Sequence, residues 1–151
     1  MTKEDKELLL KDLCARLPYV TFVYVEWHET EELEIYEGCE DGEDEPNIHT
    51  LISCDYYGEC QLDDNLYETI YNIKPYLRPM SSMTDEEKIE LCTISYAPDE
   101  MKTIEEKLYV IKTNAENATD FYNKHHFDYH GLIEKGLAIE VTPENNPYKN
   151  I

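Results

Sequence analysis

Two prolines in one short segment divide this chain into two parts. Pro75 and Pro79 lie within residues 74–84, and proline fixes φ and removes a backbone N–H donor. Because a central strand uses its donors on both sides, we expect neither a helix nor a central strand to run through this segment. The sequence therefore predicts an extended connector between a strand-rich part, 1–73, and a mainly helical part, 85–151.

Hydrophobic patterns predict the elements of the first part. Thr2 is a typical N-cap, and a helix is expected over residues 2–16 because apolar residues follow at helical spacing, namely Leu10, Leu13, Cys14 and Leu17. Short runs rich in β-branched and aromatic residues are typical of strands. Strands are expected over 20–27, 33–37, 48–54 and 59–62, with an acidic loop over 38–47 and either a strand or a 3₁₀ turn over 66–73.

Capping signals and helical periodicity predict the second part. Thr84 and Glu87 have the spacing of a capping box before a helix over 84–94. The buried candidates of that helix are Ile89, Leu91 and Cys92. Further along we favour a helix over 103–111, although 108–111 also fits a strand, and we expect a helix over 115–126. A one-turn helix over 131–135 that ends at Gly136, a closing strand over 137–141 and a frayed tail over 144–151 should follow.

These elements predict one α+β domain. A length of 151 residues fits a single domain with its own core. Short strands at close spacing indicate a small antiparallel sheet, either open or curled into a barrel. We expect the N-terminal helix to pack on this sheet and the C-terminal half to be mainly helical.

The distribution of charge is the most informative feature for function. Between residues 17 and 73 there is no Lys or Arg, whereas 16 of the 34 acidic residues lie there, in a chain with a net charge of -21. Charge runs are usually solvated surface, and such a surface would repel the phosphate backbone, so no direct binding of nucleic acid is expected. The functional alternatives are a protein partner, of which a basic one fits this surface, and mimicry of DNA that occupies the groove of a DNA-binding enzyme.

The expected partner-binding residues come from this acidic region and from its exposed aromatic residues. Tyrosines combine apolar area with a polar hydroxyl, which suits an interface, and those at 24, 36, 56, 57, 67 and 71 are the aromatic candidates. The selected residues are Glu29, Glu31, Glu32, Glu34, Glu40, Asp41, Glu43, Asp44, Glu45, Tyr56 and Tyr57.

The sequence offers little support for a metal, a cofactor or catalysis. The densest group of possible metal ligands is His125, His126, Asp128 and His130, but His125 lies on the apolar face of a predicted helix, where a histidine usually packs. No P-loop, dinucleotide fingerprint or nucleophile elbow is present. We therefore expect no metal site, no cofactor and no enzymatic activity.

Cysteine usage and hydropathy indicate the compartment. The cysteines are odd in number and include no C-x-x-C pair, so reduced thiols are expected at Cys14, Cys39, Cys54, Cys60 and Cys92. No apolar run is long enough to span a membrane, and the N-terminal residues lack the apolar core of a signal peptide. We expect a cytoplasmic protein without membrane association, and the oligomeric state stays open.

Three segments resemble a known family. They are LLLKDLCARLPY at 8–19, IKPYLRPMSSMT at 73–84 and HHFDYHGLIEKGLA at 125–138, and together they are similar to small uncharacterised proteins carried by prophages and mobile elements of gut bacteria. Residues 20–72 depart from that pattern. The resemblance implies an accessory protein of a phage or mobile element, and the interpretation we favour is a non-enzymatic protein-interaction module. The alternative is an acidic inhibitor that mimics DNA.

Overall fold

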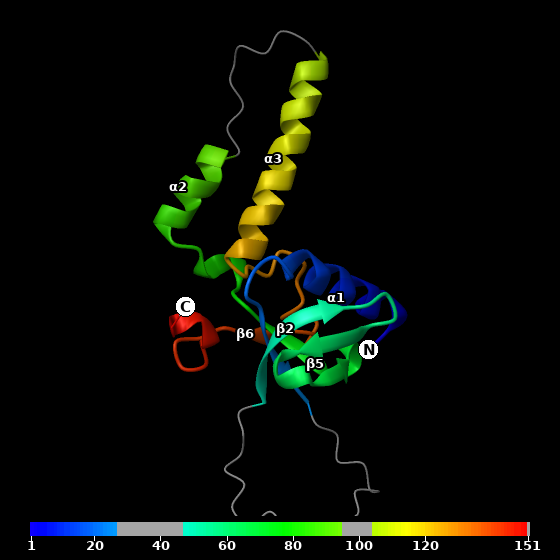
Figure 1. Cartoon of the computed structure of the whole chain (residues 1–151). Coiled ribbons are helices and arrows are strands. Elements are labelled where there is room, and N and C mark those ends of the chain that lie inside the picture. Colours follow the sequence, from blue (N-terminus) through cyan, green and yellow to red (C-terminus); the bar gives the residue numbers. More distant parts are fainter. Residues whose placement is uncertain (27–46, 95–103, 151) are drawn as a thin grey trace, which may run out of the picture.

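The computed structural model describes residues 1–26, 47–94 and 104–150, and in these ranges the chain forms three α-helices and six strands (Figure 1). The helices are α1 (Lys3–Arg16), α2 (Asp85–Ile94) and α3 (Ile104–Lys124). The strands are β1 (Phe22–Val25), β2 (Ile48–Cys54), β3 (Glu59–Leu62), β4 (Tyr67–Thr69), β5 (Ile73–Leu77) and β6 (Ile139–Glu140). Short 3₁₀ helices add η1 (Asp63–Asn65), η2 (Ile70–Asn72), η3 (Met80–Ser82) and η4 (Pro147–Asn150). The predicted strand over 33–37 and the acidic loop lie outside the described residues.

The described strands form one open, mixed sheet. Their order is β4-β3-β2-β1-β5-β6, and every neighbouring pair is antiparallel except β5 and β6, which are parallel. The α+β class is confirmed, and the sheet does not close into a barrel. Closure would require the two edge strands to pair, and β4 and β6 are too short and lie at opposite edges.

The prediction that no central strand enters the proline segment is wrong for its first half, because β5 pairs with β1 through Pro75. The backbone N–H of Glu26 donates to the backbone carbonyl oxygen of Asn72 at 2.8 Å. Since hydrogen-bonded pairs alternate along an antiparallel ladder, the nitrogen of Pro75 faces away from β1. On that outer side β6 pairs only with Tyr76 and Leu77. No described strand therefore needs the donor that Pro75 lacks.

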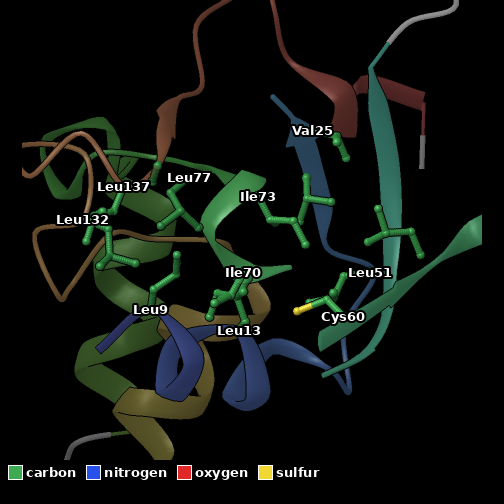
Figure 2. Close-up of a cluster of buried hydrophobic side chains, with 13 residues drawn as sticks. Leu9, Leu13, Val25, Leu51, Cys60, Ile70, Ile73, Leu77, Leu132 and Leu137 are labelled. Carbon is green, nitrogen blue, oxygen red and sulfur yellow. The ribbon is translucent and has the colours of Figure 1, made fainter. Parts of the chain in front are cut away.

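The hydrophobic core lies between α1, the sheet and the segment before β6 (Figure 2). Leu9 and Leu13 are fully buried and point from α1 toward Ile70. The predicted apolar face of this helix is therefore displaced by one residue. Its fully buried residues, Leu9, Asp12, Leu13 and Arg16, keep the expected helical spacing but include an ion pair.

The two later helices lie side by side and extend away from the sheet (Figure 1). The Thr84 and Glu87 capping box is confirmed, because the Glu87 N–H donates to Thr84 Oγ1 at 3.2 Å and the Thr84 N–H donates to Glu87 Oε2 at 2.8 Å. The expected buried face of α2 is wrong, since none of its residues is buried and Ile89 is 67% exposed. One continuous helix, α3, replaces the two helices expected over 103–111 and 115–126.

The C-terminal residues pack against the sheet, so the frayed tail is another wrong prediction. Residues 147–150 form η4. The Tyr148 hydroxyl donates to the backbone carbonyl oxygen of Tyr76 at 3.0 Å. The Phe22 N–H in turn donates to the same hydroxyl at 3.4 Å. The segment 131–135 forms a turn and not a helix, although Gly136 ends it with the expected positive φ of 71°.

Candidate functional site

The best candidate site is a groove between α1, the turn that joins β2 to β3, and η2. We call it the tyrosine groove, and its volume is about 670 Å³. It is lined by Met1, Thr2, Lys3, Lys6, Glu7, Leu10, Lys11, Cys14, Tyr56, Tyr57 and Tyr71. A groove of this size can hold one or two side chains of a bound segment or a small molecule.

Gly58 allows the β2–β3 turn to lie close against α1. Its φ is +86°, in the left-handed region that favours glycine. A Cβ atom at this position would lie 2.8 Å from Ile70 Cγ2 and 3.0 Å from Lys6 Cε. The Gly58 carbonyl also accepts a hydrogen bond from the Ile70 N–H at 2.7 Å. Glycine here therefore fixes the distance between the two walls of the groove.

A disulfide and a side-chain hydrogen bond close the same turn. Cys54 and Cys60 are paired across the β2–β3 hairpin and form a disulfide, so the prediction that all cysteines are reduced is wrong. Direct cross-strand neighbours lie close enough for this bond, and sequence spacing did not reveal that register. The Asp55 carboxylate accepts the Glu59 N–H at 2.9 Å. These bonds hold the backbone of the turn while its two tyrosines project outward.

The tyrosines of the groove are strongly exposed. Tyr56 is 87% exposed, Tyr57 80% and Tyr71 53%. The rings of Tyr56 and Tyr57 meet edge to face with centroids 5.7 Å apart. Three exposed aromatic rings around one groove are unusual for a solvated surface, because each ring could bury a large apolar area.

Lysines of α1 form the other wall of the groove. Lys6 Nζ donates to the backbone carbonyl oxygen of Tyr57 at 2.8 Å and lies 5.2 Å from the centroid of the Tyr71 ring. Lys3 and Lys11 are exposed, and Lys3 Nζ lies 3.8 Å from a Glu7 carboxylate oxygen. With three lysines and one glutamate, the groove is locally positive in a chain of net charge -21.

Only part of the predicted partner-binding set can be located. Tyr56 and Tyr57 line the groove, and their role in binding stays a prediction. The acidic members of the set lie outside the described residues, namely Glu29, Glu31, Glu32, Glu34, Glu40, Asp41, Glu43, Asp44 and Glu45. Mimicry of DNA therefore also stays a prediction, because 10 of the 16 acidic residues that suggested it fall in 27–46.

Several acidic residues of the described sheet are held by local partners. Glu26 pairs with Lys74 at 2.5 Å, and Glu68 accepts a hydrogen bond from the Asn72 amide at 3.0 Å. Burial alone would raise the pKa of Asp63, but hydrogen bonds from the Thr50 N–H and from His49 outweigh it and hold this pKa below its usual range. These carboxylates have structural partners within the sheet.

The histidines and the aspartate of the densest group of possible metal ligands have separate roles. His125 Nδ1 lies 3.4 Å from Glu87, whereas the His126 ring stacks on Tyr148 with centroids 4.0 Å apart. Asp128 accepts hydrogen bonds from the backbone N–H groups of residues 132 and 133 at 2.8 and 2.9 Å. His130 contacts Asp12 of α1. Within the described ranges, no group of three or more possible ligands is placed to hold a metal ion.

A buried polar cluster, which no sequence pattern indicated, lies on the other side of α1. Asp12 and Arg16 are both 0% exposed, and two hydrogen bonds of 2.7 and 2.9 Å join them. Arg16 Nη2 also donates to the Phe127 oxygen at 2.8 Å, and His130 Nδ1 lies 3.0 Å from Asp12 Oδ1. We call Asp12, Arg16 and His130 the buried polar cluster. It ties α1 to residues that are far away in sequence and has the character of a scaffold.

A second hollow lies on α2. Its volume is about 530 Å³, and it is lined by Lys88, Ile89, Cys92 and Thr93. These residues belong to one helix, so among the described elements no second wall fixes a ligand there. The tyrosine groove is the stronger candidate because three elements build it and a glycine and a disulfide hold its turn.

Comparison with known proteins adds no assignment to this geometry. Across the described residues, no helix combines the length and the apolar character that crossing a membrane requires. Searches against protein-family models, curated proteins and solved structures find no match for the chain.

Proposed function

We propose that this protein is a non-enzymatic interaction module that binds a segment of a partner protein in the tyrosine groove. The observation that carries the proposal is the exposure of Tyr56, Tyr57 and Tyr71 around one groove of about 670 Å³. Tyrosine is enriched at interaction hot spots, because it offers a large contact area and has few rotatable bonds.

The groove is also organised before any partner arrives. The disulfide, the Asp55 hydrogen bond and the close approach of Gly58 to α1 fix the turn that carries Tyr56 and Tyr57. A fixed turn loses little conformational entropy on binding, which leaves more of the contact energy as affinity.

The perturbed groups of the chain favour binding over catalysis. A hydrogen bond to Asp120 raises the pKa of Tyr19 to about 12, and hydrogen bonds from Arg78 lower the pKa of Glu87 to about 2. Burial lowers the pKa of His126 to about 4. None of these three residues lines the tyrosine groove, whereas catalytic groups with shifted pKa values usually share one pocket. Cys14 does line the groove, but burial raises its pKa, which disfavours the reactive thiolate. A phage or mobile-element setting and a cytoplasmic location remain part of this proposal, but the location rests on hydropathy alone, because the Cys54–Cys60 disulfide removes the argument from reduced thiols.

The test compares two tyrosine variants by affinity capture from a bacterial lysate. A C-terminal tag is used because Met1 and Thr2 line the groove. We expect Tyr56→Ala/Tyr57→Ala to lose specific partners that the wild type retains. Tyr67→Ala is the matched control, because Tyr67 is also exposed and lies on β4 outside the groove. Loss of the same partners in both variants, or in neither, would contradict a role for the groove.

A further inference from the structure

The charge of the tyrosine groove differs in sign from the charge of the chain. Three of the 13 basic residues, Lys3, Lys6 and Lys11, line this one groove together with a single acidic residue, Glu7. Lys3 and Lys6, three positions apart, are neighbours on the surface of α1, and Lys11 lines the groove further along the same helix. A segment bound against this wall would therefore meet positive charge.

Two of these lysines are available to a partner. Lys6 already has partners within the chain, because its ammonium donates to the backbone oxygen of Tyr57 and lies over the Tyr71 ring. Lys3 has only a solvent-exposed pair with Glu7 at 3.8 Å, and such pairs contribute little. Lys11 forms no ion pair within the described part of the chain. The ammonium groups of Lys3 and Lys11 can therefore pair with carboxylates of a bound segment.

The remaining walls of the groove are apolar or aromatic. Leu10 and Cys14 of α1 face the groove together with the three tyrosine rings. Burying a large apolar side chain among them would remove its surface from water and so favour binding. A partner segment that fits the tyrosine groove thus combines one bulky apolar residue, which fills the groove, with carboxylates on either side of that residue.

We infer that the partner segment of the tyrosine groove is acidic, with Asp or Glu residues around a bulky apolar anchor. This inference rests on the proposed function, and it assigns the groove a partner opposite in charge to the basic partner that the overall acidity suggests. Charges more than about 8–10 Å away are screened at physiological salt, so among the described residues those that line the groove, three lysines and one glutamate, weigh most on a bound segment.

The experiment selects displayed random peptides on the immobilised wild-type protein at physiological salt and removes peptides that also bind Tyr56→Ala/Tyr57→Ala. We expect the selected peptides to be enriched in Asp and Glu around one Leu, Phe or Trp. The leading peptide is then synthesised, and its Kd is measured for two charge variants.

The two charge variants are matched in net charge. Lys3→Glu/Lys11→Glu changes the groove, and Lys112→Glu/Lys124→Glu changes exposed positions on α3. Each takes the net charge from -21 to -25, because every substitution contributes two negative charges. The control also matches the local helix context, since Lys112 pairs with Glu116 at 3.8 Å as Lys3 pairs with Glu7.

We expect the groove variant to bind the peptide about tenfold more weakly and the α3 variant to stay within about twofold of the wild type. Neutral or basic peptides that depend on the tyrosines would overturn the acidic assignment and leave the proposed function standing. If no peptide depended on the tyrosines, the proposed function itself would fail. Self-association of the wild type that Tyr56→Ala/Tyr57→Ala abolishes would assign the groove to a second copy and overturn a separate partner.

Discussion

The two sides of α1 use charged residues in opposite ways. On the buried side, Asp12 and Arg16 are removed from water and hold each other and the backbone of residue 127. On the groove side, Lys3 and Lys11 remain exposed beside tyrosine rings. The difference separates scaffold from candidate site. Charges paired with each other inside the fold position the helix, whereas exposed charges without strong partners can recognise another molecule.

Burial explains why neither Asp12 nor Arg16 can be replaced alone without a large loss of stability. A buried ion pair gains little net stability over an apolar pair, because removing both charges from water is costly. Removing one partner is much worse, since the other charge is left without compensation. The comparison therefore predicts large stability effects on the buried side of α1 and large binding effects on the groove side.

The largest effect is expected for Arg16→Met, which removes both hydrogen bonds of the arginine to the buried Asp12 and leaves its carboxylate with His130 alone among the described side chains. We expect the free energy of unfolding, measured by urea denaturation at pH 7, to fall by about 3–5 kcal/mol. The control is the double variant Asp12→Leu/Arg16→Met, which removes both charges and should recover much of this loss. If the single and double variants were equally unstable, the buried pair would not be the cause.

A pH-dependent effect is expected at His126, which stacks on Tyr148 near the buried polar cluster. Burial, with smaller contributions from the charges of Arg16, His125 and Arg78, lowers its pKa from 6.5 to about 4. Below pH 6.5 the unfolded chain binds a proton more readily than the folded chain, so this stability is present above pH 6.5 and lost as the pH falls toward 4. The loss amounts to roughly 2–3 kcal/mol over this window.

The measurement compares urea denaturation of the wild type and His126→Asn between pH 7 and pH 4. Asparagine tolerates the positive φ of 59° at this position. We expect the difference in stability between the two proteins to narrow or change sign as the pH falls. Parallel pH profiles would show that His126 does not titrate in this way.

A smaller effect is expected at Gly58, where the groove turn meets α1. Gly58→Ala combines an unfavourable φ with a Cβ atom 2.8 Å from Ile70 Cγ2, and we expect a loss of about 2 kcal/mol. Gly136→Ala is the matched control, because its φ is also positive, at +71°, but a Cβ there meets nothing within 4 Å. Thermal denaturation of both variants separates backbone strain from the close packing of the turn.

The smallest effect on stability is expected where the effect on binding is largest. Tyr56→Ala/Tyr57→Ala removes two exposed rings that take no part in the core. We expect the free energy of unfolding to change by no more than about 0.5 kcal/mol. A loss well above that value would mean that the tyrosines support the fold, and the contrast between the two sides of α1 would be weakened.

Local signals in the sequence predicted the elements that depend on neighbouring residues. The hairpin of β2 and β3 was expected at the observed bounds, because a turn with Gly58 separates two runs of strand-forming residues. The Thr2 and Thr84 caps were also expected. Residues 66–73, which were left between a strand and a 3₁₀ turn, contain both β4 and η2.

The predictions from sequence were wrong where contacts with a distant segment determine whether a residue is buried or paired. Asp12 and Arg16 have the spacing of a surface ion pair, and their burial depends on Phe127, 111 residues beyond Arg16. Pro75 is tolerated in β5 because β6 begins its pairing one residue later. The order of the tail depends on contacts of Tyr148 with β1 and β5.

The candidate site shows the same division. Tyr56 and Tyr57 were chosen from the sequence as exposed aromatic residues in a turn, but the lysines that face them were not. The Lys6 contact with the Tyr57 oxygen joins residues 51 positions apart, which no periodicity within one helix or strand can reveal. The groove and its positive charge therefore became visible only in the folded chain.

The sequence by itself determined the α+β class, the caps of α1 and α2, the β2–β3 hairpin and the strongly acidic character of the chain. These features follow from composition and from contacts between residues a few positions apart. Tertiary structure alone decided which side of α1 is buried, that Cys54 and Cys60 pair, and that lysines and tyrosines share one groove. The physical reason is that burial and charge pairing are properties of residues brought together in space, and side chains on separate elements meet only when the chain folds.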